Sequence, residues 1–257
     1  MAKAKKVTRK KVSKKSTHVA LVLDKSGSMG TCWQEAMNGF NAQLEVILAN
    51  ADKGGKTTVS LITFNTNVDI LQDGVNPDSV KKLDQTNYCP EGGTAMYDAV
   101  WEAIKVLEAK DDKGAETAFL VVTISDGEEN SSRNVSVQQL AAKVAELNLS
   151  ERWTFAYIGA NQDLSKVSEH LGFAVGNSLS YTADSAGYRG MSAGLTGSLN
   201  NYFSNRSVGV ACMVNMMAPP ATVTGGSIPA SGVVHAPYIP RYVTTASTTT
   251  SKEKDHV

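Results

Sequence analysis

The middle of the chain alternates between two hydrophobic patterns. Short runs of apolar or β-branched residues predict buried strands, and apolar residues three and four positions apart predict helices with one buried face. Strands are predicted at residues 18–23, 58–64, 118–124 and 153–158, with a hairpin or edge strand at 68–71 and a short last strand at 173–175.

Helices are predicted between these strands. The first has an apolar face made of Trp33, Met37, Phe40, Leu44, Ile47 and Leu48, and the second has one made of Met96, Val100, Ala103, Ile104 and Leu107. A third helix begins with the capping-box spacing of Ser136 and Gln139, and its apolar face is Leu140, Val144 and Leu147. Two more helices are predicted at 164–171 and 183–203. This alternation indicates an α/β fold with a doubly wound, mostly parallel sheet and helices on both faces. In such sheets the ligand site lies at the carboxyl ends of the central strands.

The net charge of zero conceals an uneven distribution. Residues 1–17 hold eight of the 25 basic residues and none of the 25 acidic ones, so the rest of the chain carries a net charge of −8. We interpret residues 1–17 as a disordered basic arm that either only aids solubility or makes weak, non-specific contact with nucleic acid. No aromatic residue interleaves the lysines, so a sequence-specific reader is not expected.

The C-terminal end differs in another way. Five of the seven prolines follow residue 204, together with a Thr/Ser-rich run at 244–251. We therefore predict a basic arm at 1–17, one domain at 18–204 and a Pro/Thr/Ser-rich extension at 205–257. Within the extension, Tyr238, Ile239 and Tyr242 are candidate anchors for docking in a groove, and the alternative is a tail that does not dock.

Composition excludes several classes of protein. The longest apolar run, at 208–218, is interrupted by Asn215 and is too short to span a membrane. Three cysteines without CxxC spacing exclude a disulfide scaffold and a zinc ribbon. The basic N-terminus is not followed by the apolar core of a secretory signal. We expect a cytoplasmic protein, or a virion protein if the chain is encoded by a phage, with no membrane contact.

Oxygen-bearing side chains follow two of the predicted strands. Asp24, Ser26 and Ser28 occupy alternate positions after the first strand, where extended backbone sends side chains to one side. Asp126 follows the strand at 118–124, and Thr94 lies in a Gly-Gly-Thr loop that opens a helix. Two carboxylates and three hydroxyls make a hard oxygen site, which suits Mg²⁺, Mn²⁺ or Ca²⁺ and disfavours zinc.

The pattern resembles the von Willebrand factor A (vWA) domain. Asp24, Ser26, Ser28, Thr94 and Asp126 match the complete metal-ion-dependent adhesion site (MIDAS) of that family. The stretches HVALVLDKSGSM, GGTAMYDAV, TISDGEENSS and FAYIGANQD are similar to those of bacterial and phage single-domain vWA proteins, and the resemblance covers residues 18–203. It implies a mostly parallel sheet with one antiparallel edge strand. It also implies magnesium-dependent protein binding without catalysis, in which the metal captures an Asp or Glu of a partner.

Two other functions stay open. The chain is alternatively a structural or assembly component, for example of a phage particle, that docks through its tails. A metal-dependent phosphoesterase is less favoured, because Lys25 is the only cation in the motif and no general base accompanies it.

Polar residues near the predicted site are candidates for its rim or its support. The rim candidates are Glu128, Glu129, Asn130, Asn161, Gln162 and Asp163. Asp98 lies one helical turn after Thr94 and either hydrogen-bonds the site from behind or faces solvent.

Overall fold

The computed structural model describes residues 15–113, 116–160 and 163–217. A six-stranded sheet runs through the centre of the molecule in the order β3-β2-β1-β4-β5-β6. The strands are β1 (Ser16–Asp24), β2 (Lys56–Phe64), β3 (Val68–Val75), β4 (Thr117–Ser125), β5 (Trp153–Ala160) and β6 (Ser178–Tyr181). All neighbours pair in parallel except β2 and β3, which are antiparallel. The predicted fold class is confirmed, including the antiparallel edge strand.

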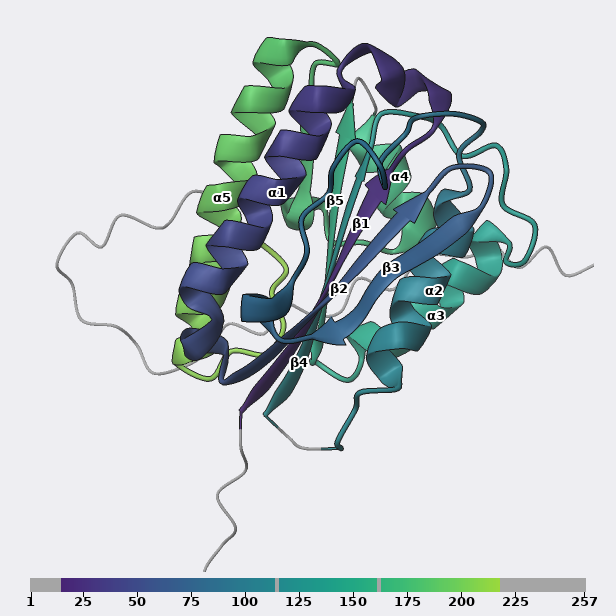
Figure 1. Ribbon diagram of the computed structural model, residues 1–257. Helices are drawn as coiled ribbons and strands as arrows, with labels where there is room; N and C mark the ends of the chain where they lie inside the picture. Colours follow the sequence, from purple (N-terminus) through teal and green to yellow (C-terminus); the bar gives the residue numbers. More distant parts are fainter. Residues whose placement is uncertain (1–14, 114–115, 161–162, 218–257) are drawn as a thin grey trace, which may run out of the picture.

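Helices cover both faces of this sheet (Figure 1). The α-helices are α1 (Trp33–Asn50), α2 (Met96–Glu108), α3 (Val137–Asn148), α4 (Leu164–Leu171) and α5 (Ser185–Ser207). Four short 3-10 turns complete the described elements: η1 (Gly27–Thr31), η2 (Ala51–Gly54), η3 (Pro77–Ser79) and η4 (Val175–Asn177). Of the helices in the described residues, none combines the length and hydrophobicity that a bilayer crossing requires.

Alternate residues of β1 pack into two separate hydrophobic cores, one on each face of the sheet. Val19 and Leu21 pack with residues of α1 and α5 on one face, whereas Ala20 and Val22 pack with residues of α2 and α3 on the other. Because successive side chains of a strand point to opposite faces, a central strand covered on both sides must be apolar throughout. This requirement explains the unbroken apolar run in the sequence.

Two details of the predicted elements are wrong. The short last strand is β6, at 178–181, whereas Phe173 enters the core and stacks on Phe155 at a ring-centroid distance of 5.3 Å. Gly172 has a φ of +72° and turns the chain after α4, and pairing with β5 begins only at Ser178. Leu48, predicted on the apolar face of α1, is 38% exposed.

The packed domain also extends past the predicted boundary at 204. Helix α5 continues to Ser207, and Arg206 is buried with its Nη2 donating to the carbonyls of Ser16 and Glu116 at 3.0 and 2.8 Å. At the other end, Ser16 and Thr17 are buried residues of β1, so the sheet begins inside the segment predicted as the arm. Residues 1–14 and 218–257, including the candidate anchors at 238–242, lie outside the described residues.

Candidate metal site

Asp24 ends the central strand β1, at the edge of the sheet where the parallel strands finish. The neighbouring β4 ends at Ser125, in register with β1 to within one residue. Ser125 Oγ donates to Asp24 Oδ2 at 2.6 Å, and the backbone N–H of Ser26 donates to Asp24 Oδ1 at 2.6 Å. The Asp24 carboxylate is fully buried, and both of its oxygens are held by hydrogen bonds.

The two serines of the motif lie side by side, but the backbone between them is not extended. Ser26 has extended φ and ψ angles, and the 3-10 turn η1 begins at the next residue. Ser26 Oγ and Ser28 Oγ are 3.1 Å apart, and Ser28 Oγ donates to Asp126 Oδ1 at 2.6 Å. Alternation along a strand therefore accounts for Asp24 and Ser26, whereas the turn is what brings Ser28 to the Asp126 carboxylate.

Gly127 shows that Thr94 belongs to the same cluster. A Cβ atom on this glycine would lie 2.8 Å from Thr94 Oγ1, 3.4 Å from Ser28 Oγ and 3.6 Å from Asp24 Oδ2. Oxygens from three separate segments thus surround one small residue. Together with the hydrogen bonds of Ser26 and Asp126, this places all five predicted side chains in one cluster.

The segment after Asp126 holds the Thr94 loop by its backbone. Asn130 Oδ1 accepts from the N–H of Thr94 at 2.9 Å, and the N–H groups of Asn130 and Ser131 donate to the carbonyl of Thr94 at 3.0 and 3.1 Å. Gly93 permits this contact, because a Cβ there would lie 2.7 Å from Asn130 Oδ1. Gly92, with a φ of +73°, accepts at its carbonyl from the N–H of Gly27 at 3.0 Å. The three loops are therefore joined to one another.

Asp98 supports this arrangement from α2. It is buried, and its carboxylate accepts from the N–H groups of Arg133, Asn134 and Val135 at 2.9 to 3.0 Å. Of the two alternatives stated for Asp98, solvent exposure is excluded. Its hydrogen bonds go to the segment that follows Asp126, so it acts on the site through that segment.

Glu129 was predicted to be a rim residue, but its carboxylate turns inward. Its Oε2 accepts from the N–H of Tyr97 at 2.9 Å, and its Oε1 accepts from the N–H groups of Ser131 and Ser132 at 2.9 and 2.7 Å. A carboxylate at the first turn of α2 satisfies an amide that the helix leaves without a partner. Glu129 therefore joins the Asp126 segment to the helix that follows Thr94.

The other rim candidates have different outcomes. Glu128 and Asn130 are exposed beside the site. Asp163 is exposed, and its carbonyl accepts from the N–H groups of Lys166 and Val167 in the first turn of α4. Asn161 and Gln162 lie outside the described residues.

Sequence reasoning missed Tyr88. This residue is buried, and its Oη donates to the backbone carbonyl of Asp24 at 2.8 Å. Tyr88 lies in an irregular segment with no periodic pattern, so no sequence signal identified the contact.

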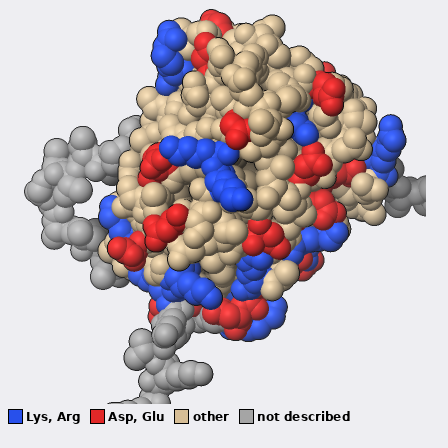
Figure 2. All heavy atoms as spheres, viewed as in Figure 1, with Lys and Arg blue, Asp and Glu red and all other residues tan. Residues whose placement is uncertain are grey.

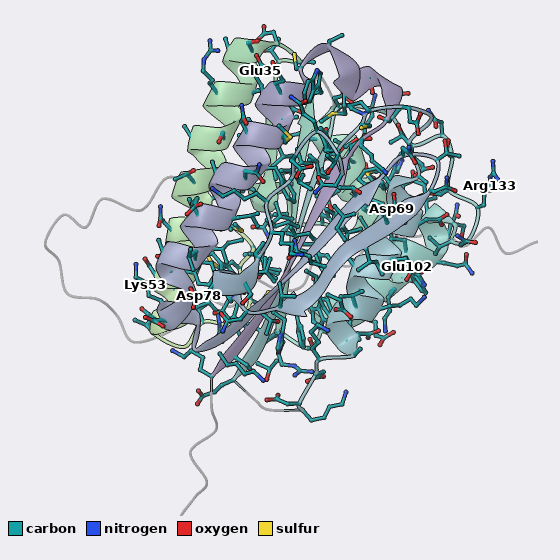
Figure 3. The ribbon with its side chains drawn as sticks, viewed as in Figure 1. Glu35, Lys53, Asp69, Asp78, Glu102 and Arg133 are labelled. Atoms are coloured by element: carbon teal, nitrogen blue, oxygen red, sulfur yellow. The ribbon has the colours of Figure 1, made fainter. Side chains whose placement is uncertain are left out.

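The electrostatics of the cluster favour an added positive charge. The pKa of Asp24 is raised to about 6, mainly by burial and less by the charge of Asp126, although hydrogen bonds from Ser125 and Ser26 oppose this rise. Burial also raises the pKa of Asp126. Lys25 does not neutralise them, because its Nζ pairs with Asp69 on β3 at 2.6 Å (Asp69 is labelled in Figure 3). Two partly desolvated carboxylates close together are destabilised unless a proton or a cation joins them.

The donor set fits a hard divalent cation. Carboxylate and hydroxyl oxygens are ligands of Mg²⁺, Mn²⁺ and Ca²⁺. Within residues 15–113, 116–160 and 163–217, no group of three or more His, Cys, Asp or Glu side chains is placed to hold a metal ion. The cluster has only two such residues, so any site here depends on its hydroxyls and does not have the ligands typical of zinc.

Known proteins with similar folds include two components of bacterial pili. The PilB minor pilin from Streptococcus sanguinis matches with a TM-score of 0.53 and 12% identity over 77% of this chain and 63% of its own. The vWF domain of the type V pili tip protein Mfa5 from Porphyromonas gingivalis matches with a TM-score of 0.51 and 11% identity over 77% of this chain and 97% of its own. The chain thus spans under two thirds of the pilin, and at these identities the likeness establishes the fold alone.

The family of the chain is identified by comparison of its sequence. No curated protein matches it significantly. The family model described as VWA domain containing CoxE-like protein matches residues 3–148, a stretch that exceeds half of the chain and includes all five residues of the cluster. The chain therefore belongs to the family of VWA domain containing CoxE-like proteins.

Proposed function

We propose that this protein is a non-enzymatic, metal-dependent protein-binding module. Asp24, Ser26, Ser28, Thr94 and Asp126 would hold Mg²⁺, with Mn²⁺ or Ca²⁺ as alternatives. The observation that carries the proposal is the convergence of these oxygens around Gly127. When bound, the cation would supply a positive charge for an Asp or Glu side chain of a partner protein.

The residues of the cluster would contribute different ligands to the cation. Asp24 and Asp126 provide two negative charges, while Ser26, Ser28 and Thr94 provide neutral oxygens. Two carboxylates only balance the charge of a divalent cation, and the other three ligands are neutral hydroxyls, so the cation stays electrophilic toward an acidic side chain of a partner. Ser125 and Tyr88 orient Asp24, and Asn130 orients the Thr94 loop.

The proposed partner is a protein, because the cation would take an Asp or Glu side chain. Basic and acidic side chains are interspersed over the face of the molecule seen in Figure 2, without a large area of one sign. Such a face lacks the basic stripe that tracks a phosphate backbone. Weak nucleic-acid contact remains assigned to the arm alone.

Catalysis is not part of this proposal. The cluster contains no histidine or cysteine, and the ammonium group of Lys25 is engaged by Asp69. A phosphoesterase needs a base and a cationic contact for the phosphate. The three unpaired cysteines of the chain fit a reducing compartment, so we place the activity in the cytoplasm, or in a virion if the chain is phage-encoded.

An assembly component is the second candidate. PilB and Mfa5 are pilus proteins by name, and their shared fold is compatible with such a role. In this case docking would use the two ends of the chain. The first described residue and the end of α5 lie away from the cluster: Lys15 Nζ donates to the carbonyl of Ser207, at the opposite end of β1 from Asp24.

Capture from the native host in Mg²⁺ and in EDTA separates the two candidates. Metal-dependent binding predicts that EDTA and Asp24→Ala abolish capture and that Asp73→Ala, an exposed residue paired with Lys110, does not. Substituting the partner's acid by its amide should then weaken binding at least tenfold in Mg²⁺ and leave the residual binding in EDTA unchanged. Capture that survives EDTA but is lost on removal of residues 218–257 would establish the assembly role instead.

A further inference from the structure

The two edges of the sheet are protected to different degrees. On β3, Asp69 and Asp73 form ion pairs with Lys25 and Lys110, and charged side chains discourage pairing with another strand. On β6, the residues are Ser178, Leu179, Ser180 and Tyr181, none of them charged. Among the described residues, β6 pairs only with β5. An uncharged open edge is a template for one more strand.

A hollow lies beside this edge. It has a volume of about 330 Å³ and lies between β6 and the first half of α5. Its lining residues are Leu179, Ser180, Tyr181, Thr182, Gly187, Gly190, Met191 and Gly194. A Cβ at Gly190 would meet nothing within 4 Å, and one at Gly194 would meet only Leu179. Gly190 therefore leaves space where another residue would place a side chain, whereas a Cβ at Gly187 would clash with the carbonyl oxygen of Thr182.

The chain itself leads to this edge. After α5, Met213 donates its N–H to Thr154 Oγ1 on β5 at 3.0 Å and accepts at its carbonyl from Asn177 Nδ2. Met216 is fully buried and donates to Asn177 Oδ1, and Met217 donates to the carbonyl of Gly176 at 3.0 Å. The described chain thus ends beside Gly176, which precedes the first residue of β6 by two positions, and 40 residues still follow.

The sequence of those 40 residues indicates which segment is suited to form an additional strand. Prolines at 219, 220, 229, 237 and 240 cannot donate to a strand ladder, and the glycines at 225, 226 and 232 weaken strands. Residues 242–250 (YVTTASTTT) contain no proline, glycine or charge and are mostly β-branched or aromatic. Such residues favour strands. The 24 residues between Met217 and this stretch are long enough for it to reach β6 in either direction.

We propose that residues 242–250 of this same chain pair with the open edge of β6 and fill the hollow beside α5. Tethering favours this occupant over a second copy, because a linked segment is held near its groove at an effective concentration in the millimolar range. The pairing would add a strand to the sheet and cover its uncharged edge. It does not depend on the metal site.

Hydrogen exchange of the full-length protein tests the pairing. We expect amides of residues 242–250 and the outward amides of Leu179–Tyr181 to exchange at least tenfold more slowly than an unstructured chain. Gly190→Leu fills the hollow and should abolish this protection in both segments. Gly197→Leu is the matched control, since it makes the same change on the same helix, also meets no atom within 4 Å and does not line the hollow.

Proline substitutions provide an independent test. Val243→Pro with Thr245→Pro removes two donors from the proposed strand and should expose β6 to exchange, whereas Thr222→Pro should not. The proposal is overturned if 242–250 exchanges at the unstructured rate in the wild type, or if Gly190→Leu and Gly197→Leu behave alike. It is also overturned if protection of β6 disappears on dilution together with a dimer detected by light scattering, because the occupant would then be a second copy.

Discussion

Ser28 Oγ donates a 2.6 Å hydrogen bond to Asp126 Oδ1, although the two residues are 98 positions apart in the sequence. The bond joins the turn after β1 to the turn after β4. A cation held by both residues would replace this direct contact with two contacts to the metal. The hydroxyl and the carboxylate are therefore already within reach of a common ligand.

Metal binding should raise the stability of the folded protein. A ligand that binds only the native state at 100 times its Kd stabilises that state by about 2.7 kcal/mol. Asp24→Ala or Asp126→Ala should abolish the Mg²⁺-dependent shift in Tm, while Asp73→Ala keeps it. Calorimetric titration with Mg²⁺ and Mn²⁺ measures the same binding directly. A wild type that shows neither heat nor a Tm shift would contradict the metal assignment.

Gly127→Ala should disable the site with little loss of stability. Its Cβ would lie 2.8 Å from Thr94 Oγ1, so the threonine hydroxyl would have to rotate away from the cluster. We expect the Kd for Mg²⁺ to rise at least tenfold, which corresponds to about 1.4 kcal/mol. Gly30→Ala is the control, because a Cβ there meets nothing within 4 Å and the residue lies in the neighbouring turn η1. Equal affinities for the two variants would argue against Thr94 as a ligand.

The metal-free protein should become more stable as the pH falls from 7 towards 4. The folded-state pKa of Asp24 is raised to about 6, above its value in the unfolded chain, so the native state binds the proton more tightly. The destabilisation is therefore present above pH 6 and is relieved as the pH falls through that value. Metal affinity should fall over the same range, because protons compete for the carboxylate. Urea unfolding in EDTA at pH 5 and pH 7 measures the effect.

Asp24→Asn is the control for this pH dependence, since an amide has no proton to gain. The variant should lose most of the stability difference between pH 5 and pH 7. If it retains the full difference, other groups are responsible.

Glu129→Gln should weaken both the fold and the metal site. The carboxylate accepts hydrogen bonds from three backbone N–H groups and from the Ser132 hydroxyl. In glutamine an NH2 group replaces one carboxylate oxygen, so some of these donors would face another donor and lose their hydrogen bonds. Buried hydrogen-bond losses of this kind cost about 1–3 kcal/mol. Glu128→Gln removes the same charge from the exposed neighbouring residue and should change stability by less than about 0.5 kcal/mol. Thermal unfolding and Mg²⁺ titration of both variants test the difference.

Local patterns account for most of the elements. Residues of α2 repeat at helical spacing and all five predicted apolar positions are buried. The capping box of Ser136 and Gln139 is formed at the start of α3. Local patterns fail to predict an element where its formation depends on a neighbouring strand or helix. The residues of β6 alternate between polar and apolar over only four positions, which is too short a pattern to identify a strand, and they form one because β5 offers a partner.

The sequence by itself determined which oxygen-bearing residues follow which strands, because parallel strands end at one edge and the motif residues lie just beyond those ends. Only the tertiary structure decided how the residues are held. Asp98 and Glu129 accept hydrogen bonds from backbone groups 32 to 37 positions away, and Tyr88 reaches Asp24 across 64 positions. Such contacts depend on the path of the folded chain, since a carboxylate satisfies whichever buried N–H groups the packing brings to it. Nothing in the spacing of the residues encodes that path.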